Sequence, residues 1–257
     1  MNEHAGRAPR PPREWWPSAS FGGRLDSLEF AALVALGRAS YVGAGTVLMR
    51  EGEPTHSVLF MHQGHVKVRA GDQQGRDHLL GIYGPGDLVG ELTTEADPKE
   101  TATVVALNRA CVSRIPRARM VAFLRERPDL ALHFVDILRA RLYRVNHRRL
   151  HGPRRNVYPA LVRAVYDVAV FFGGPGNGNP VAIPLTQKDV AELLSVTEVS
   201  VQRCFRSLRR CGLVVTGYGR QVVPCLPCLS AEVAASATRK NEQAISGCGG
   251  HRHDHQG

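Results

Sequence analysis

Apolar residues between positions 185 and 208 recur at the spacing of two short helices joined by a tight turn. One face of the first helix carries Val190, Ala191 and Leu194. The apolar stripe of the second helix consists of Val201, Cys204, Phe205 and Leu208. Thr186, followed three residues later by Asp189, is placed to cap the first helix, and Thr197 is placed to cap the second. The segment is therefore predicted to form a helix-turn-helix.

The polar residues of this segment have the chemistry needed to bind DNA. The face opposite the apolar stripe of the second helix consists of Glu198, Val199, Gln202, Arg203 and Arg206. Arginine donates two hydrogen bonds to guanine, glutamine pairs with adenine, and glutamate accepts from cytosine. Three residues at the helix starts complete the set expected at the DNA: Thr186, Gln187 and Ser200. The alternative, a purely structural packing unit, is disfavoured by the basic residues on this face.

A β-hairpin is predicted directly after the second helix. Gly212 stands where a left-handed helix cap would fall, and two short apolar runs, 213–215 and 221–223, flank the sequence Gly-Tyr-Gly at 217–219. A hairpin in this position is the wing of a winged helix-turn-helix.

Between Ser40 and Pro116 the pattern changes to short apolar runs separated by Gly, Pro and Asp. The predicted strands are 46–49, 57–61, 65–68, 78–83, 103–107 and 110–113. Evenly spaced short strands are typical of a small jelly roll or barrel. The expected fold class is α+β, with an N-terminal β-jelly-roll domain, a long helix and a C-terminal winged helix-turn-helix domain.

Helical patterns are predicted at 118–125, 129–150 and 158–172, with Gly152-Pro153 breaking the chain between the last two. The longest helix carries apolar residues at steps of four and three, namely Ala131, Val135, Leu138, Leu142 and Val145. This is the heptad seam of a coiled coil, which would join two copies of the chain as a homodimer. The alternative is a helix packed only on its own barrel.

Five segments follow from these patterns: a flexible arm (1–24), a barrel domain (25–127), a dimerisation helix (128–151), a winged helix-turn-helix domain (152–226) and a flexible tail (227–257). The formal net charge of +10 favours an anionic partner, and the spread of the basic residues favours double-stranded DNA over a membrane surface. No run of 18 apolar residues and no secretory signal is present in the sequence, so we expect a cytoplasmic protein. The six irregularly spaced cysteines do not indicate a disulfide framework.

Three motifs in succession resemble the CRP/FNR family of bacterial transcription regulators. They are Gly-Asp-Leu-Val-Gly-Glu-Leu at 86–92 followed by Thr-Ala-Thr-Val-Val-Ala at 101–106, the heptad helix, and the winged helix-turn-helix. The resemblance spans roughly residues 25 to 225. It implies a cyclic-nucleotide-binding-type barrel and a homodimer that binds a near-palindromic site, with half-sites roughly 34 Å apart. It also implies RNA polymerase as a partner.

The effector pocket departs from the pattern of the cyclic-nucleotide-binding members. In those members Gly and Glu of the 86–92 motif hold the ribose, and an Arg-Ser/Thr pair clamps the phosphate. The corresponding positions here are Gly90, Glu91, Leu92, Glu100, Thr101 and Ala102. Glu100 stands where the arginine is expected, and its charge opposes a phosphate. We therefore expect a different effector or none, and no cofactor; the alternative is a conventional activator that binds cyclic AMP or a related nucleotide.

The second helix also departs from the family. Many members read DNA through Arg-Glu-Thr-Val-x-Arg, whereas residues 198–203 are Glu-Val-Ser-Val-Gln-Arg. Arg203 retains the last arginine and predicts one guanine contact per half-site. Val199 lacks a cytosine acceptor and offers a thymine methyl contact instead.

Other chemistries find little support in the sequence. Iron–sulfur sensing needs several cysteines near the N-terminus, and only Cys111 precedes the hinge. Four barrel histidines, His56, His62, His65 and His78, are more typical of solvated side chains than of haem ligands. Cys225 and Cys228, with Cys248 and the histidines after it, offer zinc ligands, but we favour an incidental pair followed by a flexible tail. No catalytic pair, Walker-type loop or metal-ligand helix indicates an enzyme.

Overall fold

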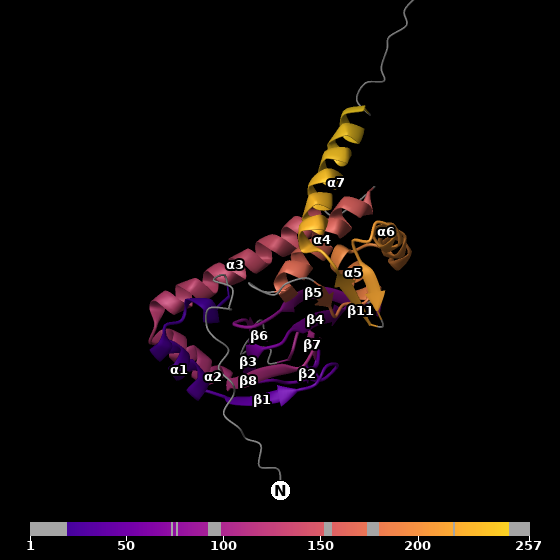
Figure 1. Ribbon diagram of the computed structural model, residues 1–257. Helices are drawn as coiled ribbons and strands as arrows, with labels where there is room; N and C mark the ends of the chain where they lie inside the picture. The colour runs from indigo at the N-terminus through magenta and orange to yellow at the C-terminus, as the bar shows by residue number, and fades with distance from the viewer. Residues whose placement is uncertain are drawn as a thin grey trace, which may run out of the picture. The chain divides into compact units, whose positions relative to one another are not determined.

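The computed structural model describes residues 20–72, 74–75, 77–91, 99–151, 156–173, 180–217 and 219–246 (Figure 1). The chain divides into two compact units, Met1–His151 and Gly152–Gly257. Several sequence expectations fall outside the described residues: the arm up to residue 19, Leu92, the helix break at Gly152-Pro153, Tyr218 and the tail beyond residue 246.

The first unit contains two four-stranded antiparallel sheets, in the order β1-β8-β3-β6 and β2-β7-β4-β5. The strands are β1 (Arg38–Val42), β2 (Val47–Met49), β3 (Ser57–Gln63), β4 (Val66–Gly71), β5 (Asp77–Tyr83), β6 (Leu88–Val89), β7 (Thr103–Ala106) and β8 (Ala110–Pro116). All six predicted strands are confirmed. β1 was not predicted because its side chains are mostly exposed, and β6 because it is two residues long.

Alternating apolar residues of the two sheets form the barrel core. Val66 and Val68 on β4 and Val104 on β7 are buried together with Val112 on β8. A second cluster packs the helices α1 (Ser27–Ala35), α2 (Arg117–Arg125) and α3 (Pro128–His151) on the barrel. The sequence patterns predicted α2 and α3 but not α1, which Asp26 begins with a capping box.

The expected flexible arm was wrong for residues 20–24. Phe21 is buried and packs against the rings of His133 and Phe134 on α3. A short 3₁₀ helix, η2, follows at Gly22–Arg24, and the Gly22 N–H donates to the Gly86 carbonyl at 2.8 Å. An aromatic ring buried against a helix orders this segment, and local composition did not show that contact.

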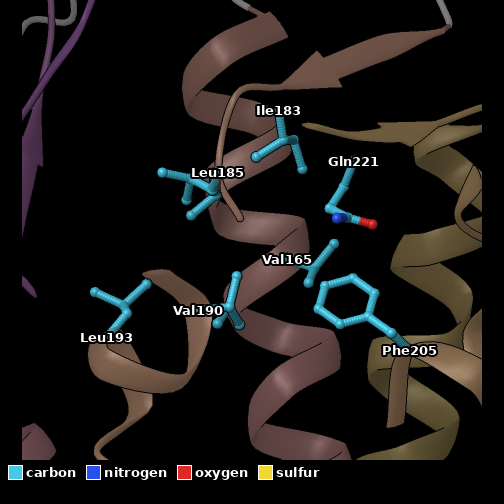
Figure 2. Close-up of a pocket in the computed structure, with 9 residues that line it drawn as sticks. Val165, Ile183, Leu185, Val190, Leu193, Phe205 and Gln221 are labelled. Atoms are coloured by element: carbon cyan, nitrogen blue, oxygen red, sulfur yellow. The ribbon is translucent and has the colours of Figure 1, made fainter. Parts of the chain in front are cut away.

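The second unit is a winged helix-turn-helix, as predicted. Its elements are α4 (Val157–Gly173), β9 (Val181–Ile183), α5 (Gln187–Leu194), α6 (Glu198–Arg210), β10 (Val215–Gly217), β11 (Arg220–Val223) and α7 (Leu226–Ser246). The predicted hairpin is β10 and β11, and β9 adds a third strand to it in the order β10-β11-β9. Figure 2 shows the core, where Val165 of α4, Val190 of α5 and Phe205 of α6 meet around a small apolar gap.

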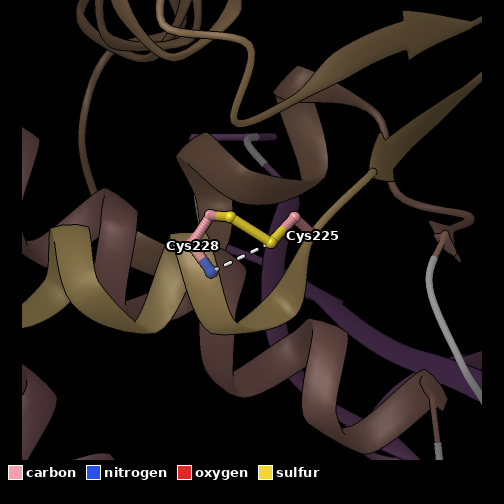
Figure 3. The surroundings of a disulfide bond; sticks show 2 residues. All are labelled: Cys225 and Cys228. Carbon is pink, nitrogen blue, oxygen red and sulfur yellow. Dashed lines mark hydrogen bonds between the residues drawn. A yellow bond between two sulfur atoms is a disulfide. The ribbon is translucent and has the colours of Figure 1, made fainter.

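The expected flexible tail from residue 227 was also wrong, because residues 226–246 form helix α7. Figure 1 shows α7 running along α4, and Leu229 in its second turn is fully buried. Cys225 and Cys228 are joined by a disulfide at the start of this helix (Figure 3).

Candidate nucleic-acid interface and effector site

The first helix of the motif begins and ends as its sequence requires. The Thr186 side chain accepts the Asp189 N–H at 3.0 Å, and the Asp189 carboxylate accepts the Thr186 N–H at 2.9 Å, which completes the predicted capping box. Helix α5 ends at Ser195, whose φ of 54° and ψ of 44° are left-handed. The Val196 N–H then returns to the Ala191 carbonyl at 3.0 Å. This reversal of the chain sets the angle at which α6 leaves α5.

The buried stripe of α6 holds the helix against the rest of its domain. Every predicted stripe residue is buried: Val201, Cys204, Phe205 and Leu208. Thr197 caps the helix by accepting the Ser200 N–H. The opposite face must therefore point to solvent.

The solvent face of α6 presents all five residues predicted for reading bases. Glu198, Val199, Gln202, Arg203 and Arg206 are exposed, and the isolated apolar side chain of Val199 is 63% exposed. The Gln202 amide donates to the Glu198 carboxylate at 3.3 Å, so these two side chains are oriented together. The face offers guanidinium, amide, carboxylate and methyl groups, which are the groups that distinguish base pairs in a major groove.

The remaining three residues expected at DNA lie at helix starts and are engaged locally. Thr186 is used in its capping box, Gln187 is half-buried, and the Ser200 hydroxyl lies 2.9 Å from the Thr197 hydroxyl. The Asp189 and Ser200 N–H groups at these two helix starts donate to the Thr186 and Thr197 caps.

Arg209 connects the end of α6 to the wing. Its guanidinium donates to the Thr216 hydroxyl of β10 at 3.0 Å, and that hydroxyl donates to the Gln221 amide oxygen of β11 at 2.9 Å. Gln221 is almost fully buried, and Figure 2 shows it among the apolar side chains of the core. This chain of hydrogen bonds fixes the wing relative to α6. The sequence does not indicate this role of Arg209, because the contact depends on the fold of the hairpin.

In the barrel, two arginines from neighbouring helices hold the 86–92 loop. Arg117 at the start of α2 donates to the Gly90 carbonyl at 3.1 Å. Gly90 has a φ of +88°, a left-handed backbone conformation in which any other side chain would be strained, and a Cβ there would also displace the end of the Met49 side chain, 2.8 Å away. Arg141 of α3 donates to the Leu88 carbonyl at 2.9 Å and forms an ion pair with Glu91.

The ion pair between Arg141 and Glu91 is nearly buried, with side-chain exposures of 11% and 10%. The Arg141 guanidinium also lies 4.4 Å from the centre of the Tyr83 ring and 3.7 Å from the Asp87 carboxylate. Burial lowers the pKa of Arg141, but Glu91, Tyr83 and Asp87 outweigh burial and raise it overall, so the cation is stable here. The partner of Glu91 is thus a side chain on α3, 50 residues away in sequence.

The other described residues of the candidate effector pocket, Glu100, Thr101 and Ala102, directly precede β7. Glu100 is buried at 5% exposure, and its backbone pairs with that of Gly52 and Glu53. Thr101 is exposed, whereas Ala102 is buried in the barrel core and serves packing rather than a ligand. A carboxylate, not a guanidinium, therefore occupies the interior position that precedes Thr101.

The predicted seam of α3 divides between buried and exposed residues. Leu130, His133 and Ile137 face the barrel and are buried. Of the seam residues, Ala131 and Leu138 are half-buried, and three are exposed, namely Val135 (48%), Leu142 (61%) and Val145 (48%). The barrel therefore covers one face of α3, and the exposed apolar strip lies on a different face of the helix.

Within the described ranges, no helix is both long and apolar enough to cross a membrane. No cluster of three or more His, Cys, Asp or Glu side chains placed to hold a metal ion occurs in that part of the chain either. The sulfur atoms of Cys225 and Cys228 are bonded to each other, and the histidines of the tail lie outside the described residues.

Comparison with known proteins agrees with this architecture. Residues 40–127 match the cyclic nucleotide-binding domain, and residues 160–229 match the Crp-like helix-turn-helix domain. A barrel of this type followed by a winged helix-turn-helix defines a class of DNA-binding transcription regulators. This chain belongs to the CRP/FNR family of transcription regulators.

The individual relatives are distant. A CRP-like cAMP-activated global transcriptional regulator of Mycobacterium tuberculosis is 24% identical over 66% of this chain and 76% of its own length. The nitrogen fixation regulation protein FixK of Bradyrhizobium diazoefficiens is 24% identical over 76% of this chain and 81% of its own. Among solved structures, the c-di-GMP responsive regulator CLP of Xanthomonas campestris shares the fold, with a TM-score of 0.64 at 18% identity over 78% of this chain and 99% of its own.

Proposed function

We propose that this protein acts as a homodimer that binds a near-palindromic promoter site by inserting α6 of each copy into the major groove. The exposed reading face of α6 carries the proposal, because its five base-reading residues are free of the domain core while the stripe behind them is buried. The protein would work in the cytoplasm, where bacterial DNA lies, and would act through contact with RNA polymerase rather than by catalysis.

The exposed strip on α3 supports the dimer. Val135, Leu142 and Val145 are apolar, exposed and spaced at steps of seven and three along the helix. Pairing with the same strip of a second copy would remove these side chains from water, which is the usual driving force of a two-stranded coiled coil. A twofold dimer also explains why a near-palindromic site would be bound.

We propose further that the barrel responds to an effector other than a conventional cyclic nucleotide, or to none. Glu100 places a carboxylate where a phosphate would need a cation, and repulsion in a desolvated pocket opposes binding. Glu91, the expected ribose ligand, is already compensated by Arg141. By their names, one relative responds to cAMP and one structural neighbour to c-di-GMP, so family membership alone does not select an effector for this chain.

The test is selection of binding sites from a random DNA library by nucleotide-free protein, repeated with cyclic mononucleotides and cyclic dinucleotides. We expect enrichment of a near-palindrome without any nucleotide. Enrichment only in the presence of cyclic AMP or a related nucleotide would instead establish a conventional cyclic-nucleotide activator. No enrichment under any condition would refute sequence-specific binding.

Arg203 provides the test at the level of one residue. Arg203→Ala should cost about 1–3 kcal/mol per half-site and relax specificity at one base pair, because a guanidinium pairs with guanine through two hydrogen bonds. Arg125→Ala, which removes an equal charge from the exposed end of α2, is the matched control and should leave the site preference unchanged. Equal weakening of Arg203→Ala on all DNA sequences would show a phosphate contact instead.

A further inference from the structure

The disulfide between Cys225 and Cys228 lies at the junction of the wing and the last helix (Figure 3). Cys225 directly precedes α7, and its sulfur accepts the Cys228 N–H at 3.2 Å. The sulfur thus takes the place that a Ser or Thr hydroxyl takes when it caps a helix start. Pro227 lies in this first turn, where a missing N–H leaves no helical hydrogen bond unmade. The disulfide therefore acts as a covalent cap of α7.

This cap joins two elements that are both anchored in the winged domain. On one side, β11 is the middle strand of its sheet, and Val223 at its end is fully buried. On the other side, α7 packs along α4, with Leu229 fully buried and the Tyr158 hydroxyl donating to Glu232 at 3.0 Å. Residues after 229 lie beyond the region that matches the Crp-like domain, so most of α7 is an addition to that domain in this chain.

The cysteine pair differs from the buried cysteines of the chain in its access to solvent. Cys228 is exposed and Cys225 is half-buried. Cys111 and Cys204 are buried, and burial raises the pKa of both thiols, which keeps them protonated and unreactive. Bacterial DNA lies in a compartment kept reducing by small thiols, where disulfides are usually transient rather than structural.

We propose that Cys225 and Cys228 are a redox-active pair that exchanges with low-molecular-weight thiols and disulfides, and that its oxidation state controls how firmly α7 is attached to the winged domain. The proposal rests on the proposed function in one respect only, since binding to DNA places the protein in the reducing compartment.

The geometry assigns a role to each sulfur. An external thiolate attacks the exposed Cys228 sulfur and forms a mixed disulfide with it, while the bond between the Cys225 and Cys228 sulfurs breaks. The electron pair of that bond leaves on the Cys225 sulfur. The resulting Cys225 thiolate accepts a hydrogen bond from the Cys228 N–H. A second external thiolate then attacks the external sulfur of the mixed disulfide and releases Cys228. In sum, two external thiols become one disulfide, and the protein pair takes up two electrons and two protons.

The experiment is a redox titration of the full chain in glutathione buffers. Cys211→Ser and Cys248→Ser are introduced first, so that the other exposed cysteine and the tail cysteine do not interfere. Acid-quenched samples are alkylated, and the peptide containing 225 and 228 is weighed by mass spectrometry. We expect both cysteines to change together, reversibly, with a midpoint inside the glutathione range.

Hydrogen exchange of the same samples tests the control of α7. Reduction should speed exchange in the first turns of α7 by about tenfold, because a covalent cap on a short loop is lost. Cys228→Ser should exchange at the reduced rate in every buffer, whereas the Cys211→Ser background should follow the redox state.

Three outcomes would overturn the proposal. The first is a pair that stays reduced at every glutathione ratio or stays oxidised in excess dithiothreitol. The second is a full titration with no change in α7 exchange, and the third is stoichiometric zinc on the reduced protein. DNA binding is measured separately in both states; its absence in both would count against the proposed function while leaving the redox result intact.

Discussion

Removing one partner of the nearly buried ion pair between Arg141 and Glu91 should destabilise the barrel, because the remaining charge would be left without compensation. Arg141→Met keeps the aliphatic part of the side chain and removes the charge. It leaves the Glu91 carboxylate at 10% exposure without its cation, takes a donor from the Leu88 carbonyl and removes the cation from the Tyr83 ring. Removing one partner of a buried pair costs about 3–5 kcal/mol. Because both side chains keep a tenth of their surface in water, we expect a loss of about 3 kcal/mol.

A double-mutant cycle separates the pair from its surroundings. Glu91→Gln alone should cost less than Arg141→Met, and the double variant should cost less than the sum of the two by about 1–2 kcal/mol. Arg139→Met is the matched control on the same helix. Its ion pair with Asp136 is 78% and 69% exposed, so its removal should change stability by less than about 0.5 kcal/mol.

The assay must report on the barrel alone, because a chain with two units does not have a single free energy of unfolding. Hydrogen exchange of peptides covering 77–91 and 128–143 gives the free energy of opening at the contact itself. Additive effects of Arg141→Met and Glu91→Gln, within about 0.5 kcal/mol, would refute the reasoning, since the two side chains would then not act as a pair.

Three further predictions concern stability and assembly. Burial lowers the pKa of His62 from 6.5 to about 4, so the unfolded chain binds more protons than the folded chain between these pH values. The free energy of unfolding of the barrel should therefore fall by about 3 kcal/mol as the pH drops from 6.5 to 4. His62→Gln should remove most of this pH dependence in acid-unfolding curves, and an unchanged slope would contradict the role given to His62. Ser195→Val should have a lower melting temperature than Ser195→Gly, because a β-branched side chain disfavours the left-handed backbone conformation of this residue. The difference between the two variants should correspond to about 1–2 kcal/mol. Equal melting temperatures would argue against the left-handed conformation. Leu142→Asp should yield monomers in sedimentation analysis, whereas Leu28→Asp, at an even more exposed apolar position on α1, should not. A dimeric Leu142→Asp protein would place the interface elsewhere.

The elements that hold DNA-reading residues were predictable because their signals are local. Helix starts at Thr186 and Thr197 depend on side chains that cap their own backbone, and the faces of α6 follow from a repeat of 3.6 residues. The wing follows in the same way from glycines and short apolar runs. Sequence therefore determined which residues of α6 face solvent, before any tertiary contact was known.

Elements without a local apolar pattern were missed. β1 has mostly exposed side chains, and β6 is two residues long, so neither carries alternation; both exist because β8 and β3 provide hydrogen-bonding partners. The ordering of Phe21 likewise depends on the rings of His133 and Phe134, more than 100 residues away. These features are decided by long-range contacts and leave little trace in neighbouring residues.

The candidate effector site also combines features that the local sequence determines with contacts that only the fold determines. Sequence by itself determined that a carboxylate, Glu100, precedes Thr101, and that the 86–92 loop carries Gly90 and Glu91. Only the tertiary structure decided that Glu91 pairs with Arg141, because the partner comes from a helix that the fold brings to the loop. It also decided that α7 continues the winged domain, since the burial of Leu229 against that domain, rather than helix propensity, holds the segment in place.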